Sequence, residues 1–133
     1  MRLSYKLWLE YRGRAFGDGP ARLLEGVERA GSLRKAAQEL GMSYNKAWRI
    51  LHAAEERLGF ALLDRSVGGS LGGGSHLTPE ARDIMSRYRA VATEAAETLE
   101  AVFQRHFADW VDPAPEAPDP DSGSEASPSA PDV

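Results

Sequence analysis

Three apolar stripes with helical spacing, each followed by a glycine, constrain the fold of this chain more than any other feature. Apolar residues recur at three- and four-residue steps over residues 20–30, 33–40 and 44–58. Serine, a preferred N-cap residue, precedes the second and third stretches, and Pro20 suits the first turn of the first. Glycine after each stretch can adopt the positive φ of a helix end. The sequence therefore predicts three short helices over residues 20–59.

The link between the second and third helices has the spacing of a helix-turn-helix. Ala37 lies four residues before Gly41. A small residue lets the two helices approach, and glycine admits the positive φ that the turn requires. This pair alone is weak evidence, because the spacing is common in ordinary helices. The first helix, the serine cap of the third and the hairpin predicted after it together favour a DNA-binding domain.

The third helix carries hydrogen-bond donors on its outer face. Asn45 suits adenine, and Arg49, one turn later on the same side, suits a guanine edge or a phosphate. We interpret Lys46 as a phosphate contact, because lysine acts as a point charge. Tyr44 either stacks on the sugar-phosphate backbone or leans against the following hairpin. The predicted DNA-binding residues are Ser32, Ser43, Tyr44, Asn45, Lys46, Arg49, Arg65, Ser75 and His76.

A wing is predicted after the third helix. Residues 60–65 and 75–77 favour two strands, joined by a glycine-rich loop over residues 68–74. The loop is not a phosphate-binding P-loop, since no Gly-Lys-Ser/Thr follows it and the next element is a strand. We expect it either to lie along the DNA backbone or minor groove, helped by Arg65 and His76, or only to span a wide hairpin.

A long helix follows the wing. Thr78 is a suitable N-cap, Pro79 suits the first turn, and the helical pattern continues to about Asp109. Some thirty residues span on the order of 45 Å, well beyond a domain with a radius of gyration of about 13 Å. We therefore expect the far end to pack on a second subunit. The predicted dimerisation residues are Ile84, Tyr88, Val91, Ala95, Leu99, Val102, Phe103 and Phe107.

The N-terminal residues predict a β hairpin. Residues 3–16 alternate apolar and polar side chains, and Arg12-Gly13 suits a tight turn between two strands. We expect Trp48 of the third helix to pack under this hairpin. The predicted divisions are a hairpin, a winged helix-turn-helix, a dimerisation helix and a tail, over residues 1–19, 20–78, 79–110 and 111–133. The fold class is mainly α with a small β component.

Charge is divided unevenly along the chain. The 133 residues have a formal net charge of −4, but residues 111–133 contain six acidic residues and no Lys or Arg. Residues 1–89 carry an excess of five positive charges, which suits a polyanionic partner. The tail is rich in Pro, Ser and Ala and is expected to be disordered. It acts either as an arm that competes with DNA or recruits a partner, or as a solubilising segment.

Several classes of function are disfavoured. The absence of cysteine excludes disulfides, thiol catalysis and cysteine-bound metals. The three histidines have no metal-ligand spacing, and carboxylates such as Glu55 and Glu56 point in different directions from a helix. We therefore predict no enzyme, no metal and no cofactor. Without an apolar run of membrane-spanning length, the protein is expected to be cytoplasmic.

The helix-turn-helix segment resembles a known family. Residues 31–37, the segment 40–48 with its Ser43-Tyr44 and Ala47-Trp48 pairs, and the glycine-rich wing are similar to the N-terminal domain of the ModE-type molybdate-responsive regulators. LysR-type regulators share a looser version of this winged helix. The resemblance implies a dimeric transcription factor whose third helix enters the major groove and whose last helix dimerises. The C-terminal oxyanion-binding domain of those regulators has no counterpart in this chain, so molybdate sensing is not carried over.

We therefore predict a homodimeric transcriptional regulator of duplex DNA, with half-sites centred about 34 Å apart or a multiple of that. By analogy alone, its genes concern molybdate or tungstate. One alternative is a winged-helix dimerisation or adaptor module without specific DNA binding. A second is a small enzyme or ligand sensor with a pocket at the dimer interface, lined by Tyr88, Phe103 and Phe107.

Overall fold

A computed structural model describes residues 1–64 and 74–110 of the chain. Within these residues a short hairpin precedes three helices, a wing and one long helix. The elements are β1 (Trp8–Glu10), β2 (Arg14–Gly17), α1 (Asp18–Ala30), α2 (Leu33–Glu39), α3 (Tyr44–Leu58), β3 (Leu63–Asp64), β4 (His76–Leu77), α4 (Pro79–Phe107) and the 3₁₀ turn η2 (Ala108–Trp110). The predicted mainly α fold with a small β component is confirmed.

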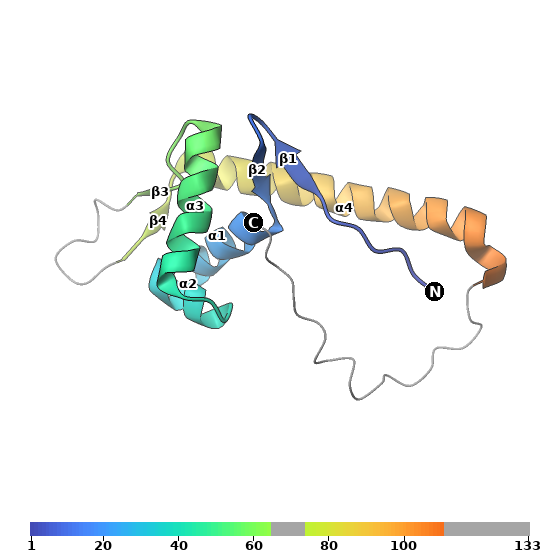
Figure 1. The fold of residues 1–133 in the computed structure, drawn as a ribbon, viewed down its shortest axis with the longest axis horizontal. Coiled ribbons are helices and arrows are strands. Elements are labelled where there is room, and N and C mark those ends of the chain that lie inside the picture. Colours follow the sequence, from blue (N-terminus) through green and yellow to red (C-terminus); the bar gives the residue numbers. More distant parts are fainter. Residues whose placement is uncertain (65–73, 111–133) are drawn as a thin grey trace.

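Helix α4 extends away from the other three helices. Figure 1 shows α1, α2 and α3 gathered at one end, with β3 and β4 projecting on one side and the hairpin β1–β2 over α1 and α3. Helix α4 begins beside this cluster and runs past the hairpin to the far end. The core lies inside the cluster, and the largest buried side chains are Phe16, Leu23, Leu24, Val27, Leu51 and Leu62.

Side-chain caps fix the starts of three helices where the sequence predicts them. The hydroxyls of Ser32, Ser43 and Thr78 accept hydrogen bonds from backbone N–H groups three residues later. Each of these bonds satisfies one of the amide donors that a helix start leaves unpaired. Gly31 and Gly59 end α1 and α3 with φ of 85° and 86°. Local chemistry therefore sets these boundaries.

The N-terminal strand is shorter than the alternation predicts. Strand β1 begins at Trp8 and pairs antiparallel with β2, which has only four residues, so nothing continues the ladder along residues 1–7. The phenolic hydroxyl of Tyr88 instead donates a hydrogen bond to the Leu7 carbonyl oxygen, at 3.1 Å. Leu3 and Tyr5, on the expected apolar side, are exposed. The predicted strand over residues 3–7 is therefore wrong.

The strands of the wing pair in a short antiparallel ladder. Leu63 faces Leu77 and Asp64 faces His76. The turn before β3 is held by Glu55, whose carboxylate accepts a hydrogen bond from the Leu62 N–H at 2.7 Å. Of the described part of the first predicted strand, residues 60–64, only Leu63 and Asp64 are in a strand. Arg65 and most of the glycine-rich loop lie outside the described residues, as does the predicted acidic tail over residues 111–133.

Candidate nucleic-acid interface

The turn between α2 and α3 is compact. Gly41 adopts a φ of 72°, in the left-handed region that favours glycine. The Met42 N–H donates to the Ala37 carbonyl at 3.0 Å, and the Ala37 side chain is buried. Because Gly41 has open space where a side chain would begin, its φ and not crowding requires glycine here. The turn therefore fixes the angle at which α3 leaves α2.

The first turn of α3 presents donors to solvent. Its start is fixed by Ser43, whose hydroxyl accepts from the Lys46 N–H at 3.1 Å. Tyr44, Asn45 and Lys46 follow on the exposed side, and Ala47 turns inward and is fully buried. The predicted group from Tyr44 to Lys46 is thus displayed at the beginning of a rigid helix.

Arg49 is exposed one turn after Asn45, as predicted. The Arg34 guanidinium lies over the Tyr44 ring, 4.6 Å from the ring centroid. The two expected positions of Tyr44, on the DNA backbone or against the wing, stay predictions. Trp48, which we expected beneath the N-terminal hairpin, stacks on His52 with 4.5 Å between the ring centroids. A groove lies between the hairpin β1–β2 and α3. Arg49 is among the α3 residues that line it, whereas Trp48 is not.

Two groups of basic residues on the helices differ in their ion pairs. On α1 and the first half of α4 the arginines are paired with carboxylates, in Arg22–Asp18, Arg29–Glu39, Arg82–Glu28, Arg87–Asp83 and Arg89–Glu25. On α2 and the first half of α3, no carboxylate among the described residues pairs with the cations, which are Arg34, Lys35, Lys46 and Arg49. We call these four residues the unpaired basic face.

The consequence of this division is electrostatic. Carboxylates neutralise the arginines of α1 and of the first half of α4 at close range, whereas the positive field of the unpaired basic face is available to attract an external anion. Arg34 and Lys35 were missed by the sequence-based prediction, which named only the cap residue Ser32 at the second helix. The sequence could have indicated their exposure, because both follow the Ser32 cap on the polar side of α2.

The other predicted contact residues lie around this face. Ser32 uses its hydroxyl to cap α2, accepting from the Lys35 N–H at 3.1 Å. The Ser75 N–H donates to the Gly31 carbonyl at 3.0 Å, which ties the base of the wing to the end of α1. His76 is exposed in β4. Their contacts with DNA stay predictions, as does that of Arg65.

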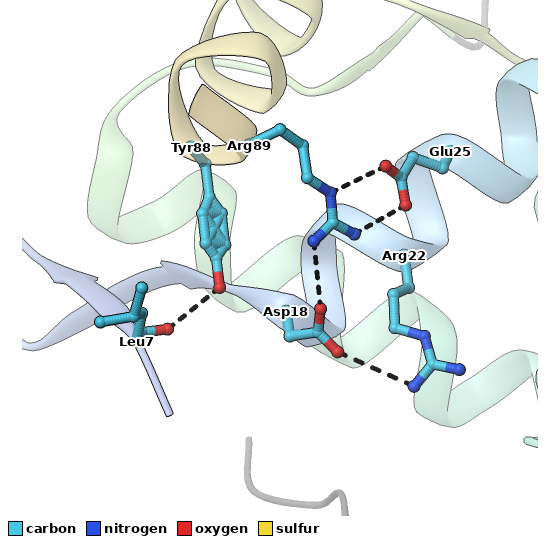
Figure 2. Close-up of polar contacts among 6 residues, drawn as sticks. All are labelled: Leu7, Asp18, Arg22, Glu25, Tyr88 and Arg89. Atoms are coloured by element: carbon cyan, nitrogen blue, oxygen red, sulfur yellow. Dashed lines mark hydrogen bonds and ion pairs between the residues drawn. The ribbon is translucent and has the colours of Figure 1, made fainter. Parts of the chain in front are cut away.

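Helix α4 is clasped to α1 by a bidentate ion pair. Figure 2 shows the Arg89 guanidinium bound to both Glu25 oxygens, at 2.9 and 2.7 Å, and to Asp18 at 3.3 Å. The hydrogen bond from Arg89 holds the pKa of Glu25 below its usual value, and the same bond raises the pKa of Arg89. The clasp fixes the direction of α4 relative to the helix-turn-helix.

The predicted dimerisation residues have unequal exposure. Tyr88 is only 4% exposed, with its ring edge-to-face against Phe16, so its side chain belongs to the core of its own chain. Phe103 is also buried, and Ile84 packs against the core. Ala95 and Leu99 are half-buried. The residues left exposed for another surface are Val91, Val102 and Phe107, followed by Trp110.

Two further properties of the described residues bear on the site. No cluster of three or more His, Cys, Asp or Glu side chains suited to a metal ion occurs in residues 1–64 and 74–110. In the same residues, no helix combines the length and the apolar character needed to cross a membrane.

The sequence around the helix-turn-helix is similar to that of known proteins. Residues 21–82 match the family model of the bacterial regulatory helix-turn-helix protein, lysR family. The chain is 37% identical over 93 residues to the molybdenum transport protein ModE of Azotobacter vinelandii, covering 70% of this chain and 34% of that protein. It is 30% identical over 94 residues to the DNA-binding transcriptional dual regulator ModE of Escherichia coli strain K12, covering 69% and 36%.

A solved structure shares the fold. The crystal structure of a CbnR_DBD–DNA complex superposes with a TM-score of 0.54 at 24% sequence identity, over 65% of this chain and 94% of that one. The chain spans about a third of the length of the ModE proteins that it matches. Together with the positions of α2, the Gly41 turn, α3 and the wing, these similarities show that the chain contains a winged helix-turn-helix domain similar to those of the lysR family and of the ModE proteins.

Proposed function

We propose that this chain is a transcriptional regulator that binds specific duplex DNA through the first half of α3. The observation that carries the proposal is the unpaired basic face, which surrounds exposed donors at the start of a rigidly capped helix. Phosphate contacts supply most of the affinity of such domains, and donors on the recognition helix supply the sequence preference. The lysR-type family match supports the same conclusion.

Each residue of the site has a distinct role. Asn45 pairs with an adenine edge and Arg49 with a guanine edge in the major groove. Lys46 neutralises a phosphate. Arg34 and Lys35 extend the phosphate contacts onto α2, on the side where the Arg34 guanidinium already covers the ring of Tyr44. The wing, with Arg65 and His76, lies along the neighbouring backbone.

The regulator acts as a homodimer. Val91, at 51% exposure, and Phe107, at 38%, leave apolar surface along α4 that a second copy would cover. Two recognition helices related by a twofold axis would then contact half-sites about 34 Å apart. Conversion of Phe107 to Glu is expected to shift the sedimentation coefficient from dimer to monomer. Thr98→Glu, at an exposed polar position of α4, is the control and should leave the dimer intact.

The proposal extends to the regulated genes. The name of the Azotobacter vinelandii relative links that protein to molybdenum transport, so the genes under control here concern the uptake or use of molybdate or tungstate. The chain performs no catalysis in this role and acts where the chromosome is, in the cytoplasm. The acidic segment over residues 111–133 either solubilises the protein or acts as an arm that competes with DNA for the basic face or recruits a partner.

Fluorescence anisotropy tests the proposal directly. Purified protein is titrated into labelled DNA from upstream of its own gene and into a scrambled duplex of the same composition. Tighter binding to the upstream DNA, lost in an Asn45→Ala, Arg49→Ala double variant, supports the regulator. Arg87→Ala is the charge-matched control for Arg49, because Arg87 is already paired with Asp83. Equal and weak binding to both duplexes in all variants would instead favour an adaptor module.

A further inference from the structure

A basic hollow lies under the N-terminal hairpin, beside the recognition helix. It is a groove of about 640 Å³, open to solvent, between β1–β2 and α3. This volume lies within the range of about 300–1,000 Å³ typical of sites for small organic ligands. Neither the helix-turn-helix nor the dimer surface on α4 accounts for it. We call it the hairpin hollow.

The hairpin hollow has an apolar floor and a cationic rim. Ile50 and the side chains of β2 that face the core form the floor, and the indole of Trp8 forms part of a wall. Four cations from the hairpin and α3 line it, namely Arg14, Lys46, Arg49 and Arg57. The described residues that line it include no Asp or Glu.

The hollow is held open by specific contacts. The Arg57 guanidinium donates a hydrogen bond to the Arg12 carbonyl at 2.6 Å and lies against Gly13, which pins the hairpin turn to the C-terminal half of α3. At the other edge, Trp8 lies against Gly17, where an added Cβ would come within 2.5 Å of the ring. The Arg14 guanidinium lies over the same ring, 3.9 Å from its centroid. The wall is therefore preformed.

The chemistry of the lining selects one class of ligand. Four cations that no described carboxylate neutralises attract an anion, and the apolar floor favours burial of a carbon skeleton over a bare inorganic ion. We propose that the hairpin hollow binds an amphipathic organic anion, with a flat apolar body on the floor and a carboxylate, sulfonate or phosphate at the rim. Guanidinium groups are well suited to hold such a head group with paired hydrogen bonds.

The position of the hollow gives this site a regulatory consequence. Lys46 and Arg49 line the hollow and also belong to the unpaired basic face. An anion bound at the rim engages charges that DNA would otherwise use, so occupancy weakens DNA binding. This consequence rests on the proposed function, whereas the existence of the anion site does not.

The fluorescent probe 1-anilinonaphthalene-8-sulfonate tests the site, because it combines an aromatic body with one sulfonate. Titration is expected to show one site per chain. The uncharged analogue N-phenyl-1-naphthylamine is expected to bind at least about tenfold more weakly, since it cannot engage the guanidinium groups. Inorganic phosphate, which has charge without an apolar body, is expected to displace the probe only at far higher concentration.

Variants locate the site. Ala53→Phe, at an exposed α3 position that lines the hollow, fills it and is expected to abolish probe binding. Arg14→Gln, which breaks no hydrogen bond that holds the hairpin, is expected to weaken it about five- to tenfold. Ala96→Phe and Arg87→Gln on α4 are the matched controls and leave probe affinity unchanged. Circular dichroism confirms that each variant is folded.

The outcomes separate this inference from the proposed function. Unchanged probe affinity in both Ala53→Phe and Arg14→Gln would overturn the site, as would equal affinity for the uncharged analogue or displacement by phosphate at probe-like concentrations. The DNA titration is then repeated with saturating probe, and a rise in the dissociation constant is expected for the wild type but not for Ala53→Phe. A chain that binds the probe in the hollow but never binds DNA would overturn the proposed function alone.

Discussion

The guanidinium of Arg89 grips both carboxylate oxygens of Glu25, joining the long helix α4 to α1 across 64 residues of sequence. Its two bonds differ by only 0.2 Å in length, at 2.9 and 2.7 Å, as in a bidentate arginine–carboxylate pair. The Arg89–Glu25 ion pair fixes the orientation of α4 relative to α1, and α4 is the helix on which a second copy would dock. The ion pair therefore contributes to the stability of the chain and, in the proposed homodimer, would influence the spacing of the two recognition helices.

The clasp makes stability depend on pH. Because the pKa of Glu25 is lowered in the folded protein, its contribution is present above the usual value of 4.5 and is lost as the pH falls below it. Arg89→Gln is expected to lower the free energy of unfolding by about 1 kcal/mol at pH 7, a figure reduced for the partial exposure of both side chains.

Urea denaturation at pH 7 and pH 3 measures this effect. The difference between Arg89→Gln and the wild type is expected to shrink as the pH falls from 7 to 3, because the ion pair loses its contribution as Glu25 takes up a proton. Arg87→Gln is the control, since its pair with Asp83 is 78% and 62% exposed and should contribute only a few tenths of a kcal/mol. An equal loss at both pH values would show that packing, and not the ion pair, explains the effect.

Tyr88 attaches the N-terminal segment to α4. Its hydroxyl donates to the Leu7 carbonyl at 3.1 Å, and its buried ring contacts Phe16. Tyr88→Phe keeps the ring but leaves the carbonyl without this donor, which is expected to cost about 1 kcal/mol. Trypsin is expected to cleave more rapidly after Lys6 in this variant. Tyr5→Phe, at an exposed tyrosine, is the control and should be cleaved at the wild-type rate. Equal rates of cleavage in Tyr88→Phe and Tyr5→Phe would contradict the attachment of the N-terminal segment to α4.

Gly26 permits the close approach of α1 and α2. A Cβ added there would lie 2.9 Å from the Ala36 Cβ and 3.4 Å from its Cα, atoms that move only with the backbone of α2. Alanine is favoured over glycine by about 1 kcal/mol within a helix, but overpacking costs about 1–3 kcal/mol. Because Ala36 is fully buried, we expect the clash to exceed the gain.

Gly19 provides the opposite case in the same helix. Nothing lies within 4 Å of a Cβ added there, so Gly19→Ala is expected to raise the melting temperature slightly. Gly26→Ala is expected to lower it by several degrees, at about 4–8 °C per kcal/mol for a domain of this size. Differential scanning calorimetry of the pair checks the signs. A stabilised Gly26→Ala variant would contradict the close packing of α1 on α2.

Local signals predicted much of the fold. The caps at Ser32, Ser43 and Thr78 lie where the sequence places them, because a capping hydrogen bond involves residues only three apart. The Gly41 turn is equally local. The recognition-helix donors were therefore identified correctly as exposed, since their exposure follows from the register of one helix.

Long-range contacts set what the sequence did not predict. An apolar stripe on α4 indicates that one side of the helix is buried, but it does not indicate which residues bury it. Tyr88 is buried by the hairpin region of its own chain and not by a second subunit. Alternation over residues 3–16 could not show that β2 is too short to pair with all of it. The hairpin hollow depends on Arg57 reaching the Arg12 carbonyl, 45 residues earlier, for which no sequence pattern exists.

The proposed binding of DNA by the unpaired basic face is tested most directly by the salt dependence of that binding. The logarithm of the association constant is measured against the logarithm of salt concentration for single Gln variants of Arg34, Lys35, Lys46 and Arg49. For each phosphate interaction that a substitution removes, the magnitude of the slope is expected to fall by about 0.9. Arg87→Gln, which removes a paired cation, is expected to leave the slope unchanged. Slopes that do not change in any of the four variants, or that fall equally in Arg87→Gln, would contradict the account.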